Sequence, residues 1–200
     1  ILEFPLFQAI VAFFSYFIGF SDALGKSIAI LFAIMGGVLL FFLTLELTGK
    51  FSVSISSTIL YFFAPLNIFY QQAFMIESTV VTLHIGAIYF WIKYLNSNNI
   101  WWCLFFIPAS VLAMLQKSVY GPFLFIVLML ILIHLKGIKK LMSVKNLFLL
   151  FFPLFVLLVW QRYVDVANTA NGNPYFTSYS KGQQLWNFGT LSERFELSIW

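Results

Sequence analysis

The sequence predicts an all-α fold: a polytopic transmembrane helical bundle of about six spans with one juxtamembrane helix. Of the 200 residues, 62% are hydrophobic and 9% are charged, whereas about 25% are charged in an average soluble domain. So little charge cannot cover a soluble surface, and 26 Phe with 6 Trp exclude a disordered chain. The apolar residues form long runs rather than short stretches of alternating polarity, which favours helices over a transmembrane barrel.

The first apolar segment, residues 6–20, is shorter than the roughly 20 residues that cross a bilayer. Pro5 suits a first helical position. Gln8 and Ser15 are seven residues apart and share one helix face. We expect a juxtamembrane helix lying at the interface, and the tail of a truncated span is the alternative.

Six longer apolar runs follow, each near the range of about 17–25 residues for a membrane-crossing helix. They cover residues 27–47, 53–70, 77–95, 100–116, 119–135 and 147–163. Pro108 and Pro153 lie inside the fourth and sixth runs, where neighbouring helices can satisfy the carbonyl that a proline frees.

The composition changes after the last run. Residues 168–189 are rich in Asn, Gly, Ser, Thr and Tyr. We therefore expect a transmembrane domain over residues 1–163 and, over residues 164–200, a non-cytoplasmic loop with a short helix near 191–197 that leads to further spans. Because the chain begins with Ile1 and ends at Trp200 without an evident signal, we expect an internal fragment of a longer protein.

The charges between the runs fall into two alternating groups. One holds six lysines against one glutamate, a net charge of +5, and the other holds five basic against six acidic residues, a net charge of −1. The positive-inside rule places the first group, with the loop 136–146, in the cytoplasm. The first group is Lys50, Lys93, Lys136, Lys139, Lys140, Lys145 and Glu46.

This pattern also bears on the partners of the chain. The lysines lie between apolar runs and form no soluble basic face, so we expect the lipid bilayer and no nucleic acid as a partner. Cys103 is the single cysteine, so the chain forms no disulfide of its own.

The candidate functional residues are charged groups at the predicted outer ends of apolar helices. Glu77 opens the third run, where it is either a general base or ligand or an acid favoured by the helix dipole. Lys117 lies in a short connection and either neutralises a phosphate or snorkels to the surface. Lys26 has the same two interpretations, and its position nearer bulk water favours the second. Glu3 precedes a predicted helix, where a solvated acid is the ordinary role.

Metal and cofactor chemistry has little support in the sequence. His84 lies within the third run, and no second His or Cys stands at metal-ligand spacing. A packing role is therefore the ordinary interpretation of His84. We expect no cofactor; a divalent metal stays an open alternative without a visible set of ligands.

Four short segments resemble motifs of the GT-C membrane glycosyltransferases, in the branch of the protein O-mannosyltransferases and aminoarabinose transferases (glycosyltransferase family 39). Residues 3–8 (EFPLFQ) are similar to "E-x-P-L-x-Q/W", and residues 19–27 (GFSDALGKS) to "G-x-S-x-x-x-x-R" with Lys in place of Arg. Residues 65–77 resemble "P-x-x-x-x-y-s-R-x-x-x-x-D", and residues 116–118 (QKS) resemble a short "x-K-G" turn.

The resemblance implies an integral-membrane glycosyltransferase with a GT-C-like fold. Members move a sugar, mannose or a related one, from a polyprenyl-phosphate donor to a lipid, glycan or protein acceptor on the non-cytoplasmic side. It implies Glu77 and Glu3 as catalytic residues and Lys117 and Gln72 as contacts to the donor phosphate. Arg162, at the outer end of the sixth run, is a further candidate for that phosphate.

This chain departs from the family pattern at several positions. Glu77 stands where the family has Asp, Gln72 where it often has Arg, and Ser118 where it has Gly. The acidic motif of the family's first external loop would lie before Ile1. Part of the active site is therefore expected outside this chain.

Two other functions remain open. A transporter or permease would favour discontinuous helices and polar groups near the bilayer midplane, often in paired repeats. A non-catalytic membrane subunit would tolerate changes at Glu77 and Lys117. The bias towards Phe, Ile, Lys and Asn suggests a bacterial protein, and we expect a multi-pass protein of the inner (plasma) membrane.

Overall fold

The computed structural model describes residues 3–180, which form helices joined by short connections and contain no strand. The all-α prediction is therefore confirmed for this part of the chain. The helix expected near residues 191–197 lies outside the described residues. In chain order the elements are α1 (Leu6–Ile18), α2 (Asp22–Thr48), α3 (Phe51–Phe63), α4 (Pro65–Gln72), α5 (Glu77–Ser97), α6 (Trp101–Gln116), the 3-10 turn η1 (Ser118–Tyr120), α7 (Gly121–Lys136), α8 (Ile138–Leu141), α9 (Val144–Ala170) and the 3-10 turn η2 (Pro174–Phe176).

Three helical stretches of the described part are long and apolar enough to cross a membrane: Asp22–Thr48, Ser118–Lys136 and Val144–Ala170. Large apolar side chains such as Leu31 and Phe123 remain more than half exposed on them, as expected for surfaces that meet lipid. Helices α1, α3 and α6 are apolar but shorter. Helix lengths and composition are thus those of a membrane protein.

The second expected span, residues 53–70, is not one continuous helix. Helices α3 and α4 are separated at Ala64, whose backbone is extended with φ −63° and ψ 127°. A proline ring disfavours the helical conformation of the residue before it, so Pro65 ends α3 and begins α4 as its first residue. The Nδ2 of Asn67 donates to the carbonyl of Tyr61 at 2.7 Å and so satisfies a carbonyl that the break leaves free.

The ends of two other helices are also informative. The expected juxtamembrane helix is α1, which ends at Gly19, where a φ of +82° suits a residue without a side chain. Helix α9 continues to Ala170, beyond the expected end at residue 163. The polar composition that begins at residue 168 therefore starts inside the helix.

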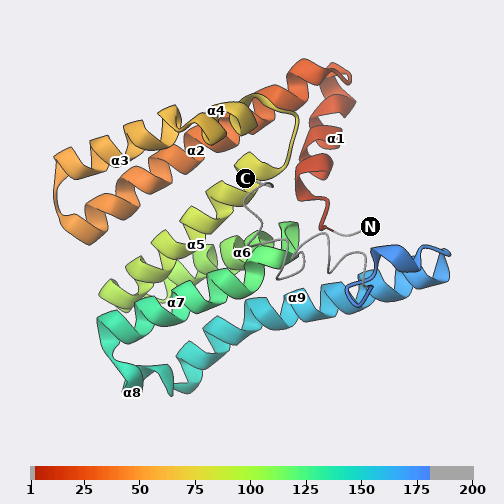
Figure 1. Cartoon of the computed structure of the whole chain (residues 1–200). Helices are drawn as coiled ribbons and strands as arrows, with labels where there is room; N and C mark the ends of the chain where they lie inside the picture. The colour runs from red at the N-terminus through yellow and green to blue at the C-terminus, as the bar shows by residue number, and fades with distance from the viewer. Residues whose placement is uncertain (1–2, 181–200) are drawn as a thin grey trace, which may run out of the picture.

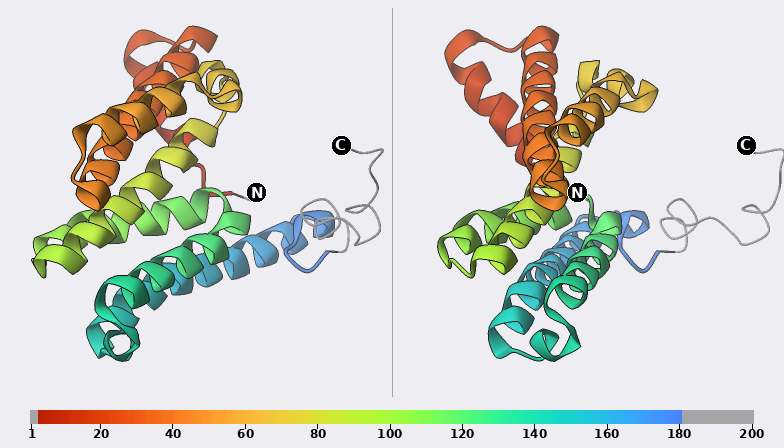
Figure 2. Two further views of the ribbon diagram at one scale, coloured as in Figure 1. Left: turned by 60° about the vertical axis from the view of Figure 1, so that its left-hand side comes forward. Right: turned by 90° about the vertical axis from the view of Figure 1, so that its left-hand side faces the viewer.

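The connections lie at two opposite ends of the molecule (Figure 1). Helices α2, α5 and α7 run in one direction, whereas α3 with α4, α6 and α9 run back. Helix α5 lies between α2 on one side and α6 on the other (Figures 1 and 2). The right-hand view of Figure 2 separates α1 to α4 from a second group formed by α5 to α9.

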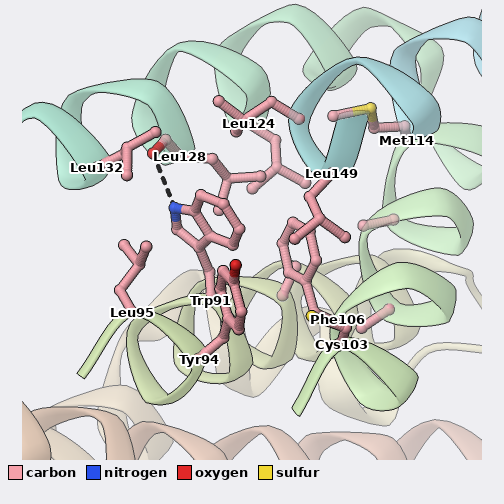
Figure 3. Packing of buried hydrophobic residues seen from close by; sticks show 14 of the residues in the cluster. Trp91, Tyr94, Leu95, Cys103, Phe106, Met114, Leu124, Leu128, Leu132 and Leu149 are labelled. Carbon is pink, nitrogen blue, oxygen red and sulfur yellow. Dashed lines mark hydrogen bonds between the residues drawn. The ribbon is translucent and has the colours of Figure 1, made fainter. Parts of the chain in front are cut away.

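Trp91 is the centre of the core that joins α5, α6 and α7 (Figure 3). Its side chain is fully buried, and its ring stacks on Phe106 with a centroid distance of 4.7 Å. Its Nε1 donates to the backbone carbonyl of Leu128 at 2.9 Å. Between helices in a membrane, close packing and interhelical hydrogen bonds supply the attraction that water supplies in a soluble core.

Helix α2 approaches α3 and α5 closely at Gly36. A Cβ on Gly36 would lie 2.7 Å from the Thr82 Oγ1 and 2.7 Å from the Tyr61 hydroxyl, so any larger residue would force these groups to shift. The Thr82 hydroxyl also donates to the carbonyl of Phe32 at 2.6 Å. Small residues that let backbones approach are typical of membrane helix interfaces.

Candidate functional site

Glu77 and Lys117 meet at one end of the bundle. Glu77 is the first residue of α5, and Lys117 is the residue that ends α6 before the turn η1. The Nζ of Lys117 lies 2.8 Å from the Oε1 of Glu77, and the two side chains are 27% and 21% exposed. The prediction that both lie at the same surface is therefore met by a direct ion pair that is partly shielded from solvent.

Glu3 lies near this pair because the N-terminal segment is fastened to α6 and α9. The backbone N–H of Phe4 donates to the carbonyl of Leu115 at 3.1 Å. The Phe4 ring packs edge-on against Trp160 at 5.1 Å between centroids. These contacts hold the carboxylate of Glu3 within the electrostatic influence of Lys117.

The pKa values of two of these groups respond to burial and to each other. Burial raises the pKa of the Glu3 carboxyl above its ordinary value; the ammonium of Lys117 opposes this rise and the carboxylate of Glu77 adds to it. Burial pushes the pKa of Lys117 down, but the hydrogen bond to Glu77 and the charges of Glu77 and Glu3 outweigh it and leave that pKa raised. Lys117 is therefore a fixed cation, and Glu3 is an acid that takes up a proton more readily than usual.

Polar atoms without partners lie in the same region. The Oε2 of Glu77 is buried and has no hydrogen-bond partner in the described part of the chain. The side chain of Gln116, next to Lys117, is fully buried, and both its amide atoms lack a partner there. A buried acceptor without a partner costs about 1–3 kcal/mol. The Oε2 of Glu77 is thus an acceptor whose hydrogen-bonding capacity is unused within the described residues.

A cavity of about 230 Å³ adjoins the ion pair, between α3, α4, α5 and η1. Its apolar lining includes Leu66, Val80 and Val81. Its polar lining includes Asn67, Tyr70 and Tyr120 besides Glu77 and Lys117, and the Lys117 Nζ lies 5.9 Å from the centre of the Tyr120 ring. Apolar walls with a few convergent polar groups are typical of a ligand site, and the volume is smaller than the roughly 300–1,000 Å³ usual for drug-sized ligands.

Three other predicted residues have separate placements. Gln72 is the last residue of α4, the helix whose Asn67 and Tyr70 line the cavity, but its side chain lies outside the described part. Arg162 lines a different hollow, with Asp165 and Tyr179 at the end of α9. The structure therefore does not bring Arg162 into the cavity of Lys117.

Lys26 and His84 fit their ordinary interpretations. Lys26 forms an exposed ion pair of 2.6 Å with Asp22, one helical turn earlier. The Nδ1 of His84 lies 2.7 Å from the carbonyl of Val80, and the ring packs edge-on against Tyr120 at 6.3 Å. Within residues 3–180, no three His, Cys, Asp or Glu side chains lie close enough to hold a metal ion.

Sequence reasoning missed the side chains that complete the cavity. Asn67 gave a usable signal, because it is an isolated amide inside an apolar run. Tyr120 follows Lys117 by three residues, within one turn of the motif already singled out. Tyr61 and Tyr70 gave no such signal, because nine tyrosines are scattered through the chain.

Comparison with known proteins does not assign the chain to a family. No protein-family model, no curated protein and no solved structure matches the chain. The fold and the site define a helical membrane protein with a charged cavity at one end of its bundle.

Proposed function

We propose that this chain is the membrane-embedded part of a glycosyltransferase with a GT-C-like fold. It moves a sugar, mannose or a related one, from a polyprenyl-phosphate donor to a lipid, glycan or protein acceptor on the non-cytoplasmic side. The observation that carries this proposal is the Glu77–Lys117 pair, whose buried Oε2 has no partner within residues 3–180 and which adjoins a cavity.

The two charges suit opposite needs of sugar transfer. The acceptor hydroxyl attacks the anomeric carbon, its proton passes to a carboxylate, and the bond between that carbon and the phosphate oxygen breaks with its electron pair leaving on the phosphate. The Oε2 of Glu77 is the proton acceptor in this scheme. Lys117 stabilises the negative charge of the departing phosphate, and such electrostatic stabilisation commonly contributes more to the rate than proton transfer does.

Glu3 has a supporting role in the same scheme. Its raised pKa makes it a better proton acceptor than an exposed glutamate. It also lies near both charges of the pair. We propose that it shares the released proton or positions the acceptor hydroxyl.

The orientation of the chain supports a site outside the cytoplasm. The lysines of the segment 136–146 lie at the last residue of α7, in α8 and in the first turn of α9. This end of the bundle is opposite the start of α5 and the end of α6, where Glu77 and Lys117 lie (Figure 1). By the positive-inside rule that end faces the cytoplasm. We propose about six passages through a bacterial inner membrane: three by the long apolar helices and three by α3 with α4, α5 and α6.

The test is sugar transfer by the full-length protein in proteoliposomes. Wild type should transfer sugar from a polyprenyl-phosphate donor, and Glu77→Gln should lose transfer while Lys26→Gln, a change in the exposed Lys26–Asp22 ion pair, should not. Equal transfer by wild type and Glu77→Gln would refute the catalytic site. It would leave the ion pair as a structural clamp in a non-catalytic subunit.

The helix break at Ala64 favours a second candidate, a transporter. Discontinuous helices beside a cavity are typical of transporter sites, and Tyr61, Leu66 and Asn67 of α3 and α4 line the cavity next to the break. A transporter would accumulate solute in vesicles without consuming a sugar donor. Measuring donor consumption together with solute uptake separates the two functions.

A further inference from the structure

A second hollow, of about 380 Å³, lies at the far end of α9 from α8, where the segment after the helix folds back beside it (Figure 1). Arg162, Asp165, Thr169 and Tyr179 supply its polar lining. Val166 and Ala170 supply its apolar lining. Its volume falls within the range of about 300–1,000 Å³ that is usual for small-ligand sites.

The acid nearest to Arg162 along α9 is Asp165, which lines the same hollow, but its carboxylate is held by Ser178. The Oδ1 of Asp165 accepts the backbone N–H of Ser178 at 2.7 Å, and its Oδ2 accepts the Ser178 hydroxyl at 2.6 Å. The three ion pairs within residues 3–180 do not include Arg162. Arg162 is therefore exposed and takes part in no ion pair within the described residues.

The position of Arg162 along α9 places it at the level of lipid headgroups. Residues 146–161 carry no charged side chain and are bounded by Lys145 and Arg162. At 1.5 Å per residue this stretch spans about 24 Å, shorter than the roughly 30 Å of a hydrocarbon core, and the long side chains of Lys145 and Arg162 can reach the interfaces at either end. Trp160 and Tyr163 flank Arg162, as aromatic residues do at a membrane interface.

We propose that this hollow binds the phosphate of a membrane phospholipid through Arg162. The planar guanidinium can donate two parallel hydrogen bonds to a phosphate. The Thr169 hydroxyl donates to the backbone carbonyl of Asp165 at 2.8 Å and accepts from the Tyr179 hydroxyl at 3.1 Å. The Tyr179 hydroxyl lines the same hollow and can turn from Thr169 to donate to one of the remaining phosphate oxygens. The site is separate from the Glu77–Lys117 cavity, and the inference does not rest on the proposed function.

The experiment titrates the full-length protein with dioleoyl-phosphatidylglycerol in detergent and measures bound lipid by native mass spectrometry. Any cation near an anionic surface contributes about fivefold to lipid affinity by charge alone. Lys26→Gln, at an exposed cation of the same end, measures that background. Arg162→Gln should lower the lipid affinity by about tenfold or more, because it removes the two parallel hydrogen bonds of the guanidinium as well as its charge. The lipid affinity of Arg162→Lys should lie between those of Arg162→Gln and Lys26→Gln.

Folding is not at risk in these variants, because Asp165 and Ser178 hold the segment after α9 without Arg162. A loss in Arg162→Gln no larger than in Lys26→Gln would overturn the site. A second arm replaces the lipid with inorganic phosphate. Arg162-dependent binding of inorganic phosphate as tight as that of the lipid would overturn the assignment to a bilayer lipid.

Discussion

The Nζ of Lys117 lies 2.8 Å from the Oε1 of Glu77, and this contact joins residues 40 positions apart in the chain. It fastens the start of α5 to the connection between α6 and η1. The same contact uses only one carboxylate oxygen and leaves the Oε2 without a partner in the described part of the chain. An ion pair that only stabilises the fold and an ion pair that takes part in catalysis would have this same geometry. Substitution of the first lowers stability, whereas substitution of the second lowers sugar transfer.

Glu77→Gln should lower sugar transfer by roughly two to four orders of magnitude, as the loss of a general base does. The amide keeps an oxygen for Lys117, and the pair is partly exposed, so the free energy of unfolding should change by about 1 kcal/mol or less. Glu77→Asp should be milder, because it keeps the carboxylate. Turnover and melting temperature of the same preparations measure both effects, and near-normal turnover in folded Glu77→Gln would remove the catalytic role.

Lys117→Ala should raise the KM for the polyprenyl-phosphate donor, because it removes a cation from the donor phosphate. Combining Glu77→Gln with the same Lys117→Ala then separates a role in stability from a role in the chemistry. Stability should partly recover in the double variant, since neither charge is left without its partner. Transfer should not recover, because both catalytic groups are gone. Parallel recovery of stability and transfer would show that the pair acts only as a clamp.

The burial of Glu3 predicts how the stability of the protein depends on pH. Burial raises its pKa in the folded protein, so the folded state holds this proton more tightly than the unfolded chain. The stability that this group contributes is fully present below its ordinary pKa and is lost as the pH rises through the raised value. Glu3→Gln should therefore gain stability relative to wild type as the pH rises from the ordinary glutamate value of about 4 through the raised pKa. Melting temperatures across this range measure the difference, and a gain that shrinks with rising pH would contradict it.

Gly36→Ala tests the close approach of α2 and α5. The added methyl would lie 2.7 Å from the Thr82 and Tyr61 hydroxyl oxygens, so we expect destabilisation of about 1–3 kcal/mol. Gly86→Ala is the matched control, because its nearest neighbour, Leu39 Cδ1, lies at an ordinary 3.4 Å. The free energy of unfolding, measured in detergent, should be clearly lower for Gly36→Ala than for Gly86→Ala. Equal stability of the two variants would refute this packing.

Single-cysteine labelling tests the orientation. In a protein whose buried Cys103 is replaced by Ser, a membrane-impermeant reagent should label Asn171→Cys in intact cells and spare Lys140→Cys. Lys140 belongs to α8, and Asn171 follows α9 at its other end (Figure 1). The reverse labelling pattern would invert the topology and place the Glu77 site in the cytoplasm.

Much of the secondary structure could be predicted, because a strongly apolar composition leaves few backbone conformations that satisfy the hydrogen-bonding groups. Backbone groups in an apolar setting must be satisfied within the segment, so long apolar runs become helices. Pro65 also carried a visible signal for the break at Ala64, since the residue before a proline avoids the helical conformation. The apolar run 53–70 therefore forms two helices rather than one, because the local effect of Pro65 outweighs the length of the run.

The candidate site could be predicted only in part. The sequence by itself determined that Glu77 and Lys117 are charges at helix ends, and a shared side followed from the alternation of connections. Only the tertiary structure decided that they touch, that Glu3 joins them, and that Arg162 faces another hollow. The physical reason is that these helices are apolar on nearly every face. Periodicity then does not fix how each helix is rotated, and close packing such as that at Gly36 sets which side chains meet.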